Sequence, residues 1–208
     1  MIWSILIASI PERYHSAHGL LYSLLETQNV ARMPDVELIY MLDNRRRSVG
    51  AKRNALLGMA AGEYVSFIDD DDTVAPDYVE RLYRTLVGTR ASDSPADVVC
   101  FPQRATLQPA GVVHECTYSL AHWRQRPADG RRTLAMTDTP GTFAWTGPPA
   151  HTMVWRRAVV AGTQFPDRMF AEDVDWVDAA CSRATSEIVL TGEPLYHYAF
   201  NEATSTTR

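Results

Sequence analysis

The sequence lacks the features that mark several specialised classes of protein. It has only three cysteines in 208 residues, none in a Cys-x-x-Cys pair, which argues against a disulfide scaffold and a zinc knuckle. No apolar run approaches the ~20 residues that a membrane-spanning helix needs. The formal net charge of −5 offers no bulk attraction to nucleic acid or to an anionic membrane. We therefore expect a folded cytoplasmic protein with no integral membrane contact.

Apolar segments and helical patterns alternate in the first half of the chain. The apolar segments predict strands at 2–10, 36–42, 64–68 and 97–101. Strands that alternate with helices are typical of βαβ units. We therefore predict an α/β fold with a mainly parallel central sheet flanked by helices.

The second half of the chain has a different pattern. Residues 102–118 alternate loosely around a Pro-Ala-Gly turn and predict a hairpin, whereas residues 119–150 predict a mobile loop region. Residues 173–184 then predict a helix, and residues 188–190 and 195–200 predict two late strands.

Polar residues directly follow three of the predicted strands. In an open sheet of parallel strands the ligand crevice lies at the carboxyl ends of the strands. These residues are therefore the first candidates for a binding site. They are Pro11-Glu12-Arg13 after the first strand, Asp43-Asn44-Arg45 after the second, and Asp69 to Asp72 after the third.

The run Asp69-Asp70-Asp71-Asp72 is the most informative of these segments. Adjacent carboxylates repel one another unless a cation relieves the repulsion. Hard oxygen ligands suit Mg²⁺ or Mn²⁺, and such ions commonly bridge a protein carboxylate and a phosphate-bearing substrate. We therefore predict a divalent metal site. A solvated acidic turn that caps the helix after Pro76 is the alternative interpretation.

Three motifs, in this order along the chain, resemble family-2 glycosyltransferases with the GT-A fold. The first strand, with Pro11-Glu12-Arg13 at its end, is similar to the opening strand of that family. Lys52-Arg53-Asn54 and the strand that ends in Asp69–Asp72 resemble its Arg-Asn helix and its DxD strand. Glu172-Asp173 resembles its Glu-Asp motif.

The resemblance covers residues 2–86 well and 151–205 loosely, and it implies a nucleotide-sugar donor, with a UDP-sugar expected first. Most of the implied roles concern this donor. The nucleoside is expected to contact Pro11, Glu12 and Arg13, and its base is expected to lie near Asp43. The diphosphate is expected beside Lys52 and Arg53. The ribose or the sugar is expected near Asp69 and Asp70. The metal ligands implied are Asp71 and, later in the chain, His197.

The resemblance also implies a catalytic base. An acceptor hydroxyl must lose its proton as it attacks, and a positioned carboxylate can take that proton. Asp173 matches the base of the family motif and Glu172 is the second candidate, with helix capping as the alternative for Asp173. Aromatic side chains that stack on a sugar are candidates for the acceptor side, with core packing as the alternative for each. They are Trp145, His151, Trp155 and Trp176.

Four arginines gather in one short segment that also contains proline and glycine: Arg124, Arg126, Arg131 and Arg132. Such a cluster in an acidic protein could bind an anionic acceptor, such as DNA or a lipid-linked phosphate. A solvated loop is the alternative interpretation. Two acceptors therefore remain possible from the sequence: a surface glycan, or a hydroxylated base in phage DNA. The second would place the protein in the cytoplasm of the host.

Together, these patterns predict one GT-A domain over 1–208, with a nucleotide-sugar-binding half at 1–101 and an acceptor-binding half at 102–208. We expect metal-dependent, inverting transfer of a sugar from a nucleoside-diphosphate sugar to an acceptor hydroxyl. Two alternatives remain. A nucleotidyltransferase also needs carboxylates beside phosphates, and a non-catalytic module could keep the fold to bind a nucleotide sugar or a glycan.

Overall fold

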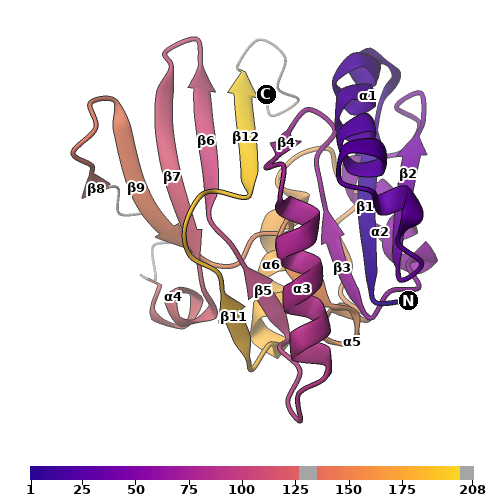
Figure 1. The fold of residues 1–208 in the computed structure, drawn as a ribbon. Helices are drawn as coiled ribbons and strands as arrows, with labels where there is room; N and C mark the ends of the chain where they lie inside the picture. The colour runs from indigo at the N-terminus through magenta and orange to yellow at the C-terminus, as the bar shows by residue number, and fades with distance from the viewer. Residues whose placement is uncertain (127–134, 202–208) are drawn as a thin grey trace.

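A central six-stranded sheet runs through the computed structural model, which describes residues 1–126 and 135–201 (Figure 1). Its strand order is β11-β5-β10-β3-β1-β2. The strands are β1 (Trp3–Ser9), β2 (Val36–Leu42), β3 (Tyr64–Phe67), β5 (Val98–Cys100), β10 (Val154–Arg156) and β11 (Glu187–Val189). β1 lies between β2 and β3, parallel to both, and it is almost entirely buried. A continuous apolar run is what a strand covered on both faces requires.

The predicted α/β class with a mainly parallel sheet is confirmed, and β10 is an addition that the sequence did not predict. β10 pairs antiparallel with both β3 and β5, so a strand from late in the chain lies inside the sheet. Its three residues are too few to show a periodic pattern, and their pairing partners are distant in sequence. The other pairs of this sheet, β1 with β2, β1 with β3 and β5 with β11, are parallel.

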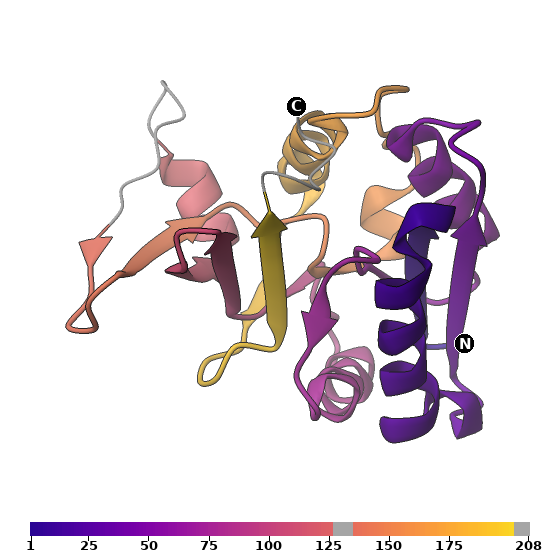
Figure 2. The same cartoon turned by 90° about the horizontal axis from the view of Figure 1, so that it is seen from above.

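Helices cover both faces of this sheet. In the two views, α1 and α3 lie on one face, and α2 and α6 lie on the other (Figures 1 and 2). The helices are α1 (Tyr14–Tyr22), α2 (Val49–Met59), α3 (Tyr78–Arg90), α4 (Leu120–Gln125), α5 (Arg157–Val160) and α6 (Glu172–Arg183). Short helical turns add Pro11–Arg13, Ser23–Thr27 and Val30–Arg32.

A second sheet of six strands stands beside the first, in the order β4-β12-β6-β7-β9-β8. Its strands are β4 (Thr73–Val74), β6 (Gln103–Gln108), β7 (Val112–Tyr118), β8 (Ala135–Met136), β9 (Thr142–Gly147) and β12 (Tyr196–Asn201). β6 and β7 form the predicted hairpin. β12 pairs with β6 and with β4, which follows the acidic turn directly, so the late strand is joined to that turn.

The prediction of a mobile loop over 119–150 is wrong for the described part of that segment. α4 and β9 lie within it, and β9 pairs in parallel with β7 over six residue pairs. Such pairing between distant segments leaves little trace in local composition. Residues 127–134, including Arg131 and Arg132, lie outside the described residues.

An aromatic cluster fills the core beneath α6. Trp176 stacks on Phe165 with ring centroids 4.6 Å apart, and both rings meet Phe67 edge to face. Trp155 contacts Trp176 in the same cluster, and both indoles are completely buried. The expectation that Trp155 and Trp176 face an acceptor is therefore wrong, and their role is core packing.

Within the described ranges 1–126 and 135–201, no helix is long and apolar enough to cross a bilayer.

Candidate active site

The carboxyl ends of β1, β2 and β3 bring the three predicted polar segments to one edge of the central sheet. The acidic turn follows β3, and its four carboxylates point to different partners. Asp70 is buried, accepts a 2.6 Å hydrogen bond from the hydroxyl of Ser9 and pairs with Arg13 at 2.9 Å. Asp72 is also buried and accepts hydrogen bonds from the Tyr196 hydroxyl and the Ala199 amide. These two carboxylates hold the turn to β1 and β12.

The other two carboxylates of the turn are partly open to solvent, with 29% of the Asp69 side chain and 34% of the Asp71 side chain exposed. Asp69 pairs with the Arg53 guanidinium at 2.7 Å, and Asp71 pairs with Arg13 at 3.0 Å. Burial, only partly offset by Arg13, raises the pKa of Asp71 to about 6. Burial acts in the same direction on Asp69, but Arg53 and His151 outweigh it and hold the pKa of Asp69 well below its usual range.

The protein itself relieves part of the repulsion within the turn. Two arginines and several hydrogen-bond donors neutralise or bind the four carboxylates, so a metal ion is not needed to explain the sequence. Residues 1–126 and 135–201 contain no group of three or more side chains set to hold a metal. A single half-exposed carboxylate, Asp71, still fits an ion that takes its remaining ligands from phosphate oxygens and water, as Mg²⁺ commonly does.

His197 does not lie with these carboxylates. Its neighbours on β12, Tyr196 and Tyr198, face the acidic turn: Tyr196 binds Asp72, and the nearby carboxylates raise the pKa of Tyr198 beyond the effect of its burial. Successive side chains of a strand point to opposite faces. His197 therefore lies on the other face, opposite Arg104 of β6, where burial and that guanidinium lower its pKa. This placement removes the geometrical basis for His197 as a metal ligand.

Lys52 joins the loops that follow β1 and β2. Its ammonium group is 2.9 Å from the Ser9 carbonyl oxygen and 3.4 Å from a carboxylate oxygen of Asp43, and the side chain is almost fully buried. Asp43 in turn accepts hydrogen bonds from the backbone amides of Arg45 and Arg47. Lys52 and Asp43 thus shape the edge of the site, and neither is a freely exposed charge in this structure.

The start of α2 is fixed by its own sequence. The Ser48 hydroxyl caps the helix by accepting a hydrogen bond from the Ala51 amide. A Cβ on Gly50 would lie 1.9 Å from the Pro166 carbonyl oxygen, so only glycine permits the helix to approach the segment that leads to α6. This contact places Arg53 between the acidic turn and α6.

Arg53 connects the two acidic segments of the site. Its guanidinium donates to Asp69 on one side and forms a very short ion pair with Glu172 on the other. The same group lies over the rings of Phe67 and Phe165, 5.8 Å and 5.5 Å from their centroids. Arg53 and Glu172 are both buried, so Glu172 is occupied by Arg53, and Asp173 is the more exposed carboxylate of the Glu172-Asp173 pair.

Asp173 is 39% exposed at its side chain and lies beside His151. One imidazole nitrogen of His151 is 3.4 Å from Asp173, and the other is 3.4 Å from Asp69. Burial raises the pKa of Asp173, but the neighbouring imidazole outweighs it and lowers the pKa to about 2. Asp173 is therefore ionised at neutral pH and can accept a proton. His151 lies between the two carboxylates rather than on a separate aromatic surface.

A cavity of about 410 Å³ opens beside the acidic turn. Glu12, Arg13 and Asp71 line it, as the sequence predicted for a donor site, and Pro11 begins the short helical turn that carries the first two. Arg45, which follows the second predicted strand, lines the cavity as well. Three further lining residues were not predicted: Ile10, His15 and Ser16. Ile10 ends the first predicted strand, and the other two lie in the first turn of α1, where no local motif marks them.

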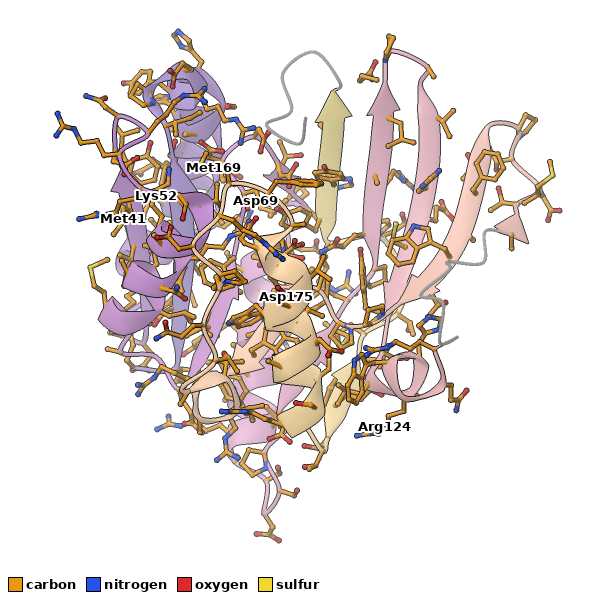
Figure 3. The ribbon with its side chains drawn as sticks, turned by 180° about the vertical axis from the view of Figure 1, so that it is seen from behind. Met41, Lys52, Asp69, Arg124, Met169 and Asp175 are labelled. Atoms are coloured by element: carbon orange, nitrogen blue, oxygen red, sulfur yellow. The ribbon has the colours of Figure 1, made fainter. Side chains whose placement is uncertain are left out.

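Trp145 and the arginine cluster lie farther from this cavity. Trp145, half-buried on β9, meets Tyr118 edge to face on the second sheet. Arg126 pairs with Asp178 at 2.5 Å, and Arg124 donates to carbonyl oxygens that follow α6. Figure 3 shows Arg124 at the far end of α6 from Asp69. Both described arginines are exposed, but Arg126 is paired with α6 and Arg124 with the backbone that follows it.

The family can now be stated. The Glycosyl transferase family 2 profile matches residues 26–144, more than half of the sequence, and the chain therefore belongs to that family. The crystal structure of S. aureus TarS residues 1–349 in complex with UDP-GlcNAc is similar with a TM-score of 0.65. That similarity covers 100% of this chain and 62% of the TarS chain at 16% sequence identity, and it confirms the GT-A fold.

Curated relatives match shorter stretches. Succinoglycan biosynthesis protein ExoO of Rhizobium meliloti is 33% identical over 78 residues, which are 36% of this chain and 22% of ExoO. Glycosyltransferase GlyA of Streptococcus pneumoniae is 37% identical over 57 residues, or 27% of this chain and 8% of GlyA. The matched region is thus less than a quarter of the length of either relative.

Proposed function

We propose that this chain transfers a sugar from a nucleoside-diphosphate sugar to the hydroxyl of a glycan acceptor, with inversion at the transferred carbon. One observation carries the proposal: Asp69 and Asp173 are both partly exposed, on either side of His151, while the carboxylates next to them are buried in ion pairs and hydrogen bonds. Burying a charge is costly unless it is paired. In this proposal the buried, paired carboxylates are supports, and the partly exposed ones, Asp69, Asp71 and Asp173, are available to a substrate or a metal ion.

The donor is assigned to the cavity beside the acidic turn. In this proposal the nucleoside lies against Glu12 and Arg13, and the diphosphate extends toward Asp71. Arg13 can donate to a phosphate oxygen, since a guanidinium suits that geometry. TarS, which shares the fold, was crystallised with UDP-GlcNAc, so UDP-GlcNAc is the first donor to test. Residues 1–101 would supply this donor half of one domain, and residues 102–208 the acceptor half.

A divalent cation belongs to the proposal as a partner of Asp71. Bound Mg²⁺ or Mn²⁺ would supply positive charge to the departing diphosphate. Asp71 is the protein ligand that the structure offers, because its carboxylate is partly exposed at the cavity while Asp70 and Asp72 are buried. Arg13 lies beside Asp71 and adds a fixed positive charge at the same place.

Asp173 is assigned the role of general base. As the acceptor oxygen bonds to the sugar, its proton passes to the Asp173 carboxylate, and the bond from the sugar to the diphosphate breaks. Loss of such a base typically reduces turnover by ~10²–10⁴-fold. The exposed fraction of Asp173 leaves one face of the carboxylate for an acceptor, whereas Glu172 is occupied by Arg53.

The acceptor favoured by this proposal is a glycan. Arg124 and Arg126 are held by α6, which weakens the case for DNA that the arginine cluster made in the sequence. The family relative ExoO is named for succinoglycan biosynthesis, a polysaccharide, which supports the same choice. A hydroxylated DNA base stays an acceptor to be compared directly.

The test is a panel of UDP-, GDP- and dTDP-sugars, each with Mg²⁺ or Mn²⁺, in which released nucleotide is identified by chromatography. We expect release of nucleoside diphosphate from one donor, with UDP-GlcNAc tested first, and loss of that release in Asp173→Asn. Asp175→Asn is the matched control, since Asp175 lies two residues further along α6 and pairs with Arg168 on the surface. Release of nucleoside monophosphate would show a nucleotidyltransferase, and binding without turnover would show a non-catalytic module.

A further inference from the structure

The loop before β10 places a histidine between the two exposed carboxylates of the site. His151 is 8% exposed, and its two ring nitrogens face Asp69 and Asp173, each at 3.4 Å. Neither nitrogen has a hydrogen-bond partner of regular geometry among residues 1–126 and 135–201. The imidazole therefore has only these two carboxylates available to it among those residues.

The protonation state of His151 decides whether its ring can donate hydrogen bonds to both Asp69 and Asp173. A neutral imidazole has one N–H group, so it could donate to one carboxylate and would turn a lone pair toward the other. An imidazolium has two N–H groups and can donate to both. The groups that face the ring are Asp69 after β3, Asp173 on α6, Arg53 on α2 and the ring of Phe67. Burial and Arg53 lower the pKa of His151, but the two carboxylates outweigh them and raise it.

Asp173 depends on this ring more than its neighbours do. Asp69 also has Arg53, and Glu172 is held by the same guanidinium, whereas the described partner of the Asp173 side chain is His151. We propose that His151 is a positioning residue that ties the candidate base Asp173 to the donor-side carboxylate Asp69. The contact between His151 and the two carboxylates rests on geometry alone. Its effect on catalysis rests on the proposed function.

The contact with His151 would fix the position of the Asp173 oxygen that takes the proton from the acceptor hydroxyl. One oxygen of Asp173 faces His151, which leaves the other oxygen toward solvent for an acceptor hydroxyl. Without the imidazole the carboxylate would be free to adopt other rotamers. A displacement of about 1 Å at a reacting group can cost on the order of 10²-fold in rate. Turnover should therefore depend on His151 although His151 itself does not touch the reacting atoms.

Three substitutions separate this role from simple packing. His151→Leu keeps much of the volume and removes both donors, and we expect kcat to fall by ~10–100-fold with the donor KM changed by less than about 3-fold. His151→Asn can place an amide N–H near the position that faces Asp173, and it should recover part of the lost kcat. His151→Gln reaches the side that faces Asp69 and should recover less. Equal kcat in His151→Leu and wild type would overturn the proposal, as would equal losses in all three variants.

A titration without substrate tests this contact even if the His151 variants fold poorly or no donor is found. The imidazole signals of the six histidines would be followed by NMR against pH, and His151 would be assigned by its NOE contacts with the neighbouring Phe67 ring. We expect His151 to titrate at lower pH in Asp173→Asn than in wild type. An unchanged titration would refute the tie even if the chain proves to be an active glycosyltransferase. A shifted titration in a chain that releases no nucleotide would preserve the tie and refute the proposed function.

Discussion

The two acidic segments of the site are built in different ways. In Asp69–Asp72 every carboxylate has a partner on another element: two are buried against β1 and β12, and two are partly exposed and paired with arginines. Of these two pairs, Arg13 with Asp71 lines the cavity. At the start of α6, Glu172 is buried and paired, while Asp173 is more exposed and has a histidine for a neighbour. The proposed donor side is thus held by more ion pairs and hydrogen bonds than Asp173, the proposed base.

Arg53 is the group on which both segments depend. It is the buried cation that faces Asp69 and Glu172 together, and it lies against two aromatic rings of the core. A buried ion pair adds little stability as a whole, yet removing one partner leaves an uncompensated buried charge. The comparison therefore predicts that changes at Asp173 affect turnover and that changes at Arg53 affect folding.

The largest effect on turnover is expected at Asp173, the proposed base. Asp173→Asn should lower turnover by ~10²–10⁴-fold, because the amide cannot accept the acceptor proton. Donor affinity measured by calorimetry should stay nearly unchanged, since the donor is assigned to the other acidic segment. If activity survives within a few-fold, the base lies elsewhere and Glu172 is the next residue to change.

Removing the shared cation should cost stability. We expect Arg53→Met to lower the free energy of unfolding by about 3–5 kcal/mol, because Glu172 would lose its buried partner. Arg84→Met is the matched control: Arg84 pairs with Glu80 on the surface of α3, and such a pair contributes about 0.3–0.5 kcal/mol. Urea denaturation of the two variants and wild type gives the comparison. Equal midpoints for both variants would contradict the assigned role of Arg53.

A smaller effect on stability is expected for Asp71→Asn, and it should depend on pH. Its pKa in the folded protein, about 6, lies above the ordinary value of 3.8. The protonated carboxyl therefore stabilises the fold fully below pH 3.8, and this contribution is lost as the pH rises through 6. Asp71→Asn should unfold at the same or a higher temperature than wild type at pH 7.5, and the difference should shrink toward pH 4. Calorimetric melting of both proteins tests this, and a lower Tm for the variant at pH 7.5 would contradict it.

The smallest effect is expected at the arginines beside α6. Double substitution of Arg124 and Arg126 by glutamine should leave the salt dependence of DNA binding unchanged, because both side chains already bind α6. A phosphate contact would instead contribute about −0.9 per arginine to the slope of log K against log salt for duplex DNA. Binding of labelled duplex DNA across a salt series measures that slope. A shallower slope in the variant would restore DNA as the leading acceptor.

The strands β1, β2 and β3 were predicted well because they are encoded locally. They are mainly apolar runs, and the polar residues that follow them meet at one edge of the sheet by the rule for strand ends. The acidic run also indicated a site. Its partners could not be predicted, since Arg13, Arg53 and Tyr196 come from three other elements.

The second half of the chain was predicted in part. The hairpin, the helix near 173–184 and the two late strands are confirmed, but the non-local contacts of β9 and β10 could not be predicted. β10 enters the first sheet antiparallel, and β9 joins the second sheet, in both cases beside strands distant in sequence. The complete burial of Trp176 could not be predicted from the sequence. An aromatic residue near a charged motif can lie in the core or at the surface. His151 was identified only as an aromatic candidate, and its place between two carboxylates emerges from the fold.

The central claim is that the edge formed by β1, β2 and β3 binds a nucleoside diphosphate through Asp71 and a divalent cation. Calorimetric titration of UDP into wild type and Asp71→Asn, each with Mn²⁺ and with a chelator, tests it most directly. We expect wild type with Mn²⁺ to bind UDP at least ~10-fold more tightly than either the chelated protein or the variant, a difference of about 1.4 kcal/mol. Equal affinity in all four titrations, or no binding of UDP or any other nucleoside diphosphate, would contradict the claim.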